Sequence, residues 1–91
     1  MSEDEYIQLI RHGWPSEGCP SDRLLAMAQE AAELYPLSSE LQCLRGDLLR
    51  LLPSADDAIL QEAIRCYRRA LAVDPNSIEA LEELGSCYDI L

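Results

Sequence analysis

The sequence predicts a small all-α domain of about five helices, packed as antiparallel helix-turn-helix pairs. Leu occurs sixteen times and Ala ten times in 91 residues, whereas Ile and Val together occur seven times. This bias favours helices over strands. Five segments place apolar residues at helical spacing, and each ends at Gly, Pro or the last residue. The short turns between them indicate antiparallel neighbours within one domain, residues 1–91.

The first predicted helix covers residues 3–12. Ser2 and Glu5 have the spacing of a capping box, in which each side chain accepts a hydrogen bond from the other residue's backbone N–H. Gly13 should end the helix, because glycine is common just after a helix C-terminus. Trp14 follows in a loop rich in glycine and proline. We expect Trp14 to pack over the end of the first helix pair, and a role as a ligand anchor is the alternative.

The second and third predicted helices are separated by a short turn. The second begins near Ser21 or Asp22, and Pro36 ends it because proline disfavours the helical conformation of the preceding residue. The third is capped by Ser38 or Ser39 and ends before Pro53.

The fourth helix should run from about residue 55 to residue 73, with Ser54 as its cap and Pro75 just beyond its end. Asn76 should cap the fifth helix. The apolar residues of that helix that we expect to face the fourth follow helical spacing and are Leu81, Leu84, Tyr88 and Leu91.

The predicted interior combines large aliphatic residues with small ones at helix crossings. Its centre should be formed by Leu24, Leu44, Leu48, Ala63, Tyr67, Ala70 and Leu84. Gly46 and Gly85 should mark close approaches between helices, because glycine has no Cβ. The fifth helix has no following helix to cover it, so Ile90 and Leu91 are expected to form a homodimer contact or to be partly exposed.

An internal repeat appears when the chain is shifted by 39 residues. The identical aligned pairs include Ala31 with Ala70, Pro36 with Pro75, Ser38 with Ser77, Glu40 with Glu79, and Gly46 with Gly85. A repeated pair of helices explains this pattern.

The repeat resembles the tetratricopeptide repeat (TPR) family. Leu81, Leu84, Gly85 and Tyr88 match the first helix of its motif, with Leu in place of Trp, and Ala63, Tyr67, Ala70 and Pro75 match the second helix and its stop. The spacing of 39 departs from the family period of about 34. The resemblance divides the chain into a divergent first helix and loop (1–20), the second helix of a first repeat (21–37), a full repeat (38–75) and the first helix of a further repeat (76–91).

The resemblance implies a right-handed superhelix and a non-enzymatic module that binds a peptide or protein on its concave face. Carried over to this sequence, that face would hold Glu40, Cys43, Asp47, Arg50, Glu79, Glu82, Ser86 and Asp89. The family's clamp for chaperone C-termini needs Lys, Arg and Asn there. This chain has no Lys, and its only Asn is in a turn, so that role is excluded.

The charge of the chain points to a basic partner. A formal charge of −10 disfavours nucleic acid and anionic membranes, and no apolar run is long enough to span a bilayer. The N-terminus lacks the pattern of a signal peptide, so we expect a soluble, cytoplasmic protein. Arg65, Arg68 and Arg69 form the one basic cluster. Local pairing, as between Glu62 and Arg65, is the expected role, and a site for phosphoryl groups or an acidic partner is the alternative.

No enzyme signature is present, and we expect no catalytic residue, cofactor or metal site. The four cysteines, Cys19, Cys43, Cys66 and Cys87, are expected to be reduced thiols in apolar surroundings. A metal site through His12 and Cys19 and a redox switch using Cys43, Cys66 or Cys87 are alternatives. For the chain as a whole, the alternative to a binding module is a self-associating structural oligomer or a fragment of a longer TPR array.

Overall fold

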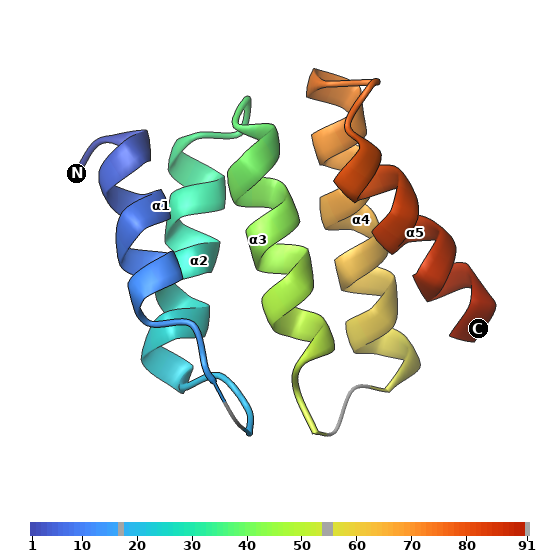
Figure 1. Cartoon of the computed structure of the whole chain (residues 1–91), viewed down its shortest axis with the longest axis horizontal. Coiled ribbons are helices and arrows are strands. Elements are labelled where there is room, and N and C mark those ends of the chain that lie inside the picture. Colours follow the sequence, from blue (N-terminus) through green and yellow to red (C-terminus); the bar gives the residue numbers. More distant parts are fainter. Residues whose placement is uncertain (17, 54–55, 91) are drawn as a thin grey trace.

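The computed structural model describes residues 1–16, 18–53 and 56–90, with the side chain of Ile90 excepted. It contains five helices: α1 (Glu3–His12), α2 (Asp22–Leu34), α3 (Ser39–Arg50), α4 (Asp57–Val73) and α5 (Ile78–Ile90). No strand occurs in these ranges. Successive helices are antiparallel and lie side by side, with the two ends of the chain at opposite edges (Figure 1). The all-α prediction is confirmed.

Short polar side chains begin the helices as the sequence predicts. Ser2 and Glu5 form the capping box of α1, Ser21 caps α2 and Ser38 caps α3. Each of these serine hydroxyls accepts a hydrogen bond from a backbone N–H in the first turn, which otherwise has no partner. Gly13 follows the last residue of α1.

The caps of the last two helices differ from the prediction. α4 begins at Asp57, and the Asp56 carboxylate accepts a hydrogen bond from the Ile59 N–H at 3.0 Å. The predicted cap Ser54 lies outside the described residues. α5 is capped by Ser77, whose hydroxyl accepts from the Ala80 N–H. The prediction of Asn76 is wrong, because Asn76 lies in the turn and its N–H donates to the Asp74 carboxylate.

The helices pack in chain order around a central α3. Each helix contacts the next, and α3 also contacts α1 and α5, whereas α2 and α4 make no contact within the described ranges. The molecule is therefore a flattened slab of 35 × 31 × 19 Å. α1, α3 and α5 follow one another along one side of it. No helix among the described residues is both long and apolar enough to cross a lipid bilayer.

Two core clusters meet at α3. The first joins α1, α2 and α3 and includes Ile10 and Leu48, which are fully buried. Trp14 packs against this cluster, as predicted. The second joins α3, α4 and α5 around Tyr67 and Ala70. Of the predicted interior residues, all are buried except Leu84, which is half-buried at the edge of the second cluster.

The orientation of α5 differs from the prediction. Ala80 and Cys87 are fully buried against α4, whereas Leu81 is 52% exposed and Tyr88 is 47% exposed. The small side chains let α5 approach α4 closely, and this turns the larger ones outward. The predicted homodimer contact lies outside the described part of the chain, which excludes Leu91 and the Ile90 side chain, so it stays a prediction.

The two glycines of the repeat have different surroundings. A Cβ at Gly46 would lie 2.8 Å from Cζ of Tyr67, so this position is a close approach between α3 and α4. A Cβ at Gly85 would meet no atom within 4 Å. The prediction that Gly85 is also a close approach is therefore wrong, because no described helix lies over it.

Candidate functional site

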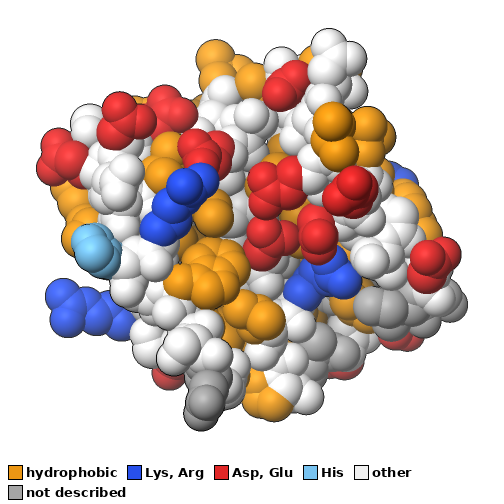
Figure 2. All heavy atoms as spheres, viewed as in Figure 1, with side chains coloured by type: hydrophobic (Ala, Val, Ile, Leu, Met, Phe, Trp, Pro, Cys, Tyr) orange, Lys and Arg blue, Asp and Glu red, His pale blue; other side chains and the backbone are white. Residues whose placement is uncertain are grey.

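Carboxylates gather on the side of the molecule formed by α1, α3 and α5. Figure 2 shows them over the middle of this side, with basic side chains at their margins. Glu40 and Asp47 are seven residues apart on α3, so they share one helix face. Glu79 and Glu83 come from α5 and lie close enough to Asp47 to act on its ionisation. We call these four residues the acidic face.

Asp47 is the most constrained residue of the acidic face. The Tyr67 hydroxyl, which projects from the buried side of α4, donates a hydrogen bond to Oδ1 of Asp47 at 2.6 Å. Burial raises the pKa of the Asp47 carboxyl to about 6, and the bond from Tyr67 offsets part of this rise. The neighbouring Glu83 and Glu79 raise the pKa further through like-charge repulsion. A cation placed at this point would relieve the repulsion.

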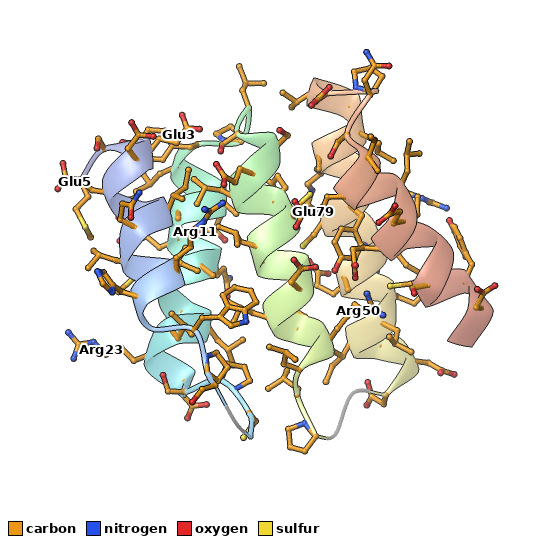
Figure 3. The ribbon with its side chains drawn as sticks, viewed as in Figure 1. Glu3, Glu5, Arg11, Arg23, Arg50 and Glu79 are labelled. Atoms are coloured by element: carbon orange, nitrogen blue, oxygen red, sulfur yellow. The ribbon has the colours of Figure 1, made fainter. Side chains whose placement is uncertain are left out.

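Two arginines border the acidic face. Arg50 of α3 forms an ion pair with Glu83 of α5, and Arg11 of α1 forms one with Glu40 of α3. In Figure 3, Glu79 of α5 lies beside α3, and Arg50 is the last residue of α3. Arg11 reaches from α1 toward α3. Both pairs join helices that are not consecutive in the chain, so they tie α1, α3 and α5 together along this side.

The other residues predicted for the site are placed differently. Glu82, Ser86 and Asp89 are exposed on α5, and among the described residues no hydrogen bond or ion pair links their side chains to α3. Cys43 is 2% exposed and packs in the second core cluster, so its thiol does not line the surface. Burial raises the pKa of Cys43 to about 12.

Glu83 is a site residue that the sequence reasoning missed. The 39-residue shift aligns it with Leu44 of the first core cluster, so a buried apolar residue is expected there. The signal that could have identified Glu83 is its charge at a position where the other copy of the repeat has a buried leucine. Its charge is balanced by the ion pair with Arg50 of α3, two helices earlier in the chain.

The cysteines other than Cys43 behave as structural thiols or lie at the surface. Cys66 and Cys87 are fully buried and free, and Cys19 is free and exposed. Burial raises the pKa of the Cys66 and Cys87 thiols, which lowers their thiolate fraction and their reactivity. Among the described residues, no group of three or more His, Cys, Asp or Glu side chains is arranged to hold a metal ion.

Two of the three arginines of α4, Arg65 and Arg68, make polar contacts. Arg65 pairs with Glu62, as predicted, and Glu62 also lies 3.4 Å from Arg45 of α3. Arg68 donates a hydrogen bond to the Tyr88 hydroxyl of α5. These contacts join α4 to both neighbouring helices.

A groove of about 420 Å³ lies between α2 and α4, and residues of α3 line its base. Gln42 is 2% exposed here, and its Nε2 donates to the Ala32 carbonyl at 3.2 Å. Its Oε1 has no hydrogen-bond partner in the described part of the chain. Gln42 and Asp47 lie on different faces of α3, so this groove is separate from the acidic face.

The raised pKa of Asp47 predicts a stability that falls as pH rises. The folded chain holds the Asp47 proton with a pKa of about 6, whereas the ordinary value is 3.8. Between these values the folded state binds more protons than the unfolded state, so the free energy of unfolding decreases with rising pH. We expect Asp47→Asn, which can still accept from Tyr67, to be more stable than the wild type above pH 7 and similar to it near pH 4.

Urea denaturation of both proteins across this pH range measures the effect. Glu82→Gln is the control, because it removes an exposed charge from α5 and should give a difference that depends little on pH. A stability difference between Asp47→Asn and the wild type that does not change with pH would contradict the prediction.

Comparison with known proteins finds a partial relative in the human proteome. No family model matches the chain, and no solved structure matches it either. The human protein named tetratricopeptide repeat protein 7B is 37% identical over 60 residues, which cover 66% of this chain. The match covers 6% of the human protein, so the chain spans a small fraction of that relative's length.

Proposed function

We propose that the chain, given its similarity to part of a tetratricopeptide repeat protein, is a non-enzymatic module of that family that binds a protein or peptide. Three observations support this: the antiparallel helices, the internal 39-residue repeat and the partial relative. The free, buried thiols suit a reducing compartment, so we place the module in the cytoplasm.

The binding surface we propose is the acidic face, extended along α5 by Glu82, Ser86 and Asp89. The observation that carries this proposal is the convergence of Asp47, Glu79 and Glu83. Glu83 is already paired with Arg50, whereas Asp47 and Glu79 form no ion pair among the described residues. The repulsion that Asp47 experiences in its partly buried surroundings disfavours the free state, and a Lys or Arg side chain of a partner would reduce it. We therefore propose a basic segment as the ligand.

The packing order also supports a concave form for this side. α1, α3 and α5 contact one another in sequence, whereas α2 and α4 do not approach each other in the described ranges. A stack in which the helices are closer together on one side than on the other curves toward that side. The acidic face would then lie on the inside of a superhelix.

A basic peptide tests the proposal. We expect a labelled peptide of alternating Arg and Ser to bind, with fluorescence anisotropy as the measurement. Its affinity should fall as salt rises, because exposed charges are screened within about 8 Å at physiological ionic strength. Glu79→Lys combined with Glu82→Lys should lower the affinity by about tenfold, equivalent to about 1.4 kcal/mol.

The matched control is Glu30→Lys combined with Glu33→Lys. These exposed residues lie on α2, and the double variant changes the net charge by the same amount. It should retain most of the affinity. An equal loss in both double variants would show that only the net charge matters, and tight binding of an Asp-Ser peptide would also contradict the proposal.

A further inference from the structure

The groove between α2 and α4 is a second hollow of the surface, separate from the acidic face. Its volume of about 420 Å³ is in the range of pockets that hold small ligands. α2 and α4 do not contact each other in the described ranges, so the space between them is open and residues of α3 form its floor. We call this hollow the α2–α4 groove.

The floor of the α2–α4 groove holds a buried hydrogen-bond acceptor that has no partner. Gln42 is 2% exposed, and its Nε2 donates to the Ala32 carbonyl at 3.2 Å. This contact fixes the orientation of the carboxamide, because an oxygen in place of Nε2 would face the carbonyl oxygen. Oε1 of Gln42 has no partner in the described part of the chain. A buried acceptor is unfavourable without a donor, so a ligand that fills the groove is expected to supply one.

The charged side chains of the α2–α4 groove balance one another. Glu33 and Glu62 carry the negative charges, and Arg45 and Arg69 carry the positive ones. Glu62 lies 3.4 Å from Arg45, so this pair is already neutralised. The lining therefore has no net formal charge, although the whole chain carries −10. An ion of either sign would gain little from such a lining, which favours a neutral ligand.

Two guanidinium groups lie close together on the α4 side of the groove. Burial raises the pKa of the Cys66 thiol, and Arg45 and Arg69 both oppose this rise, so both lie near the same buried sulfur. Arg45 is also one helical turn from Gln42 on α3. Arg69 makes no ion pair or side-chain hydrogen bond among the described residues. Its N–H groups can therefore donate to an oxygen of a ligand.

We propose that the α2–α4 groove binds a short extended segment of a partner protein through its peptide backbone. A backbone N–H would donate to Oε1 of Gln42, and a neighbouring carbonyl would accept from Arg45 or Arg69. A peptide group is neutral and carries a donor and an acceptor side by side, as these residues require. A cationic donor would be repelled by Arg45, and a carboxylate would leave Oε1 unsatisfied. This site does not depend on a basic ligand at the acidic face.

A neutral peptide tests the proposal. The probe is a short peptide of alternating Ser and Thr with blocked ends, titrated into the isotopically labelled full chain. We expect NMR shift changes at the side-chain amide of Gln42 and at the backbone amides of Ala32 and Arg69. The same peptide with N-methylated backbone amides should bind at least about tenfold more weakly, because it has no N–H to donate.

Gln42→Met is the matching change in the full chain, since it removes the acceptor and keeps the length of the side chain. This variant should bind the neutral peptide at least about tenfold more weakly. Gln29→Met is the matched control, because it makes the same change at an exposed position of the groove wall and should leave the affinity unchanged. Circular dichroism checks that both variants fold, and the N-methylated peptide gives the same test on the wild-type chain.

Three results would overturn the proposal: no shift at Gln42, equal affinity for the N-methylated peptide, or equal affinity of Gln42→Met and wild type, which would mean that only water meets Oε1. Tighter binding of the Arg-Ser peptide at the same residues would assign a cationic donor and also overturn it. Glu79→Lys combined with Glu82→Lys should bind the neutral peptide normally. A loss in that variant would place the peptide on the acidic face and contradict a separate site.

Discussion

Replacing Tyr67 by alanine is expected to remove most of the stability of the domain. Tyr67 has no exposed surface, and it lies in the second core cluster between α3 and α4. Truncating a buried aromatic residue costs about 3–5 kcal/mol, which is comparable with the total stability of about 5–15 kcal/mol of a small domain. The variant should lose cooperative unfolding or melt far below the wild type, as measured by circular dichroism during heating.

Two further tyrosine variants separate the contributions of packing and hydrogen bonding. Tyr67→Phe keeps the ring but leaves Asp47 without its hydrogen bond, so it should cost about 1–3 kcal/mol. Tyr88→Ala is the control, because this half-exposed ring makes its polar contact with Arg68 at the surface. It should cost less than about 1 kcal/mol. Equal losses at Tyr67 and Tyr88 would show that Tyr67 is not the centre of this core.

Leucine at the two equivalent glycines should change stability in opposite directions. At Gly46 the new side chain meets the Tyr67 ring from 2.8 Å onward, and α3 must move away from α4. Overpacking of this kind costs about 1–3 kcal/mol and occasionally more. At Gly85 an added Cβ meets no described atom within 4 Å, and leucine is the better helix former by about 0.5–1 kcal/mol.

The melting temperatures of the two variants measure this difference. Gly46→Leu should melt below the wild type, and Gly85→Leu should melt at or above it. Each variant is the control for the other, because the same side chain is added at the same position of the repeat. A decrease of similar size in both would mean that Gly85 is covered in solution, as it would be if copies of the chain associated through α5.

The helices could be predicted because local chemistry determines where they begin and end. Ser2, Ser21 and Ser38 can accept hydrogen bonds from the first-turn N–H groups, while Gly13 and Pro36 interrupt the backbone pattern. None of these effects requires a distant contact. The caps of α4 and α5 were harder to predict, because each is one of several adjacent polar residues that could serve.

The orientation of α5 could not be predicted because its apolar residues cover a wide arc. Leu81 and Tyr88 fit the helical period, and so do Ala80, Leu84 and Cys87. The choice between the two faces depends on how closely α4 can approach, which is a tertiary effect. The smaller pair, Ala80 and Cys87, is buried.

The acidic face could be predicted only in outline. Glu40, Asp47 and Glu79 followed from the family resemblance, but the partner of Asp47 is Tyr67, twenty residues away on another helix. That contact depends on the register between α3 and α4, which the fit of the Tyr67 ring against Gly46 determines. Cys43 is buried for the same reason, since it lies where α3 packs against α4 and α5.

The two core clusters share only α3, and this makes the buried thiols reporters of partial opening. Cys43 and Cys87 are in the second cluster, whereas the first contains no cysteine. Detachment of α5 alone would uncover Cys87 while Ile10 and Leu48 stay packed. The rate at which an alkylating reagent modifies these thiols therefore reports the free energy of opening the C-terminal half, independently of global unfolding. The modification rate of Cys87 therefore measures how often α5 separates from the other helices.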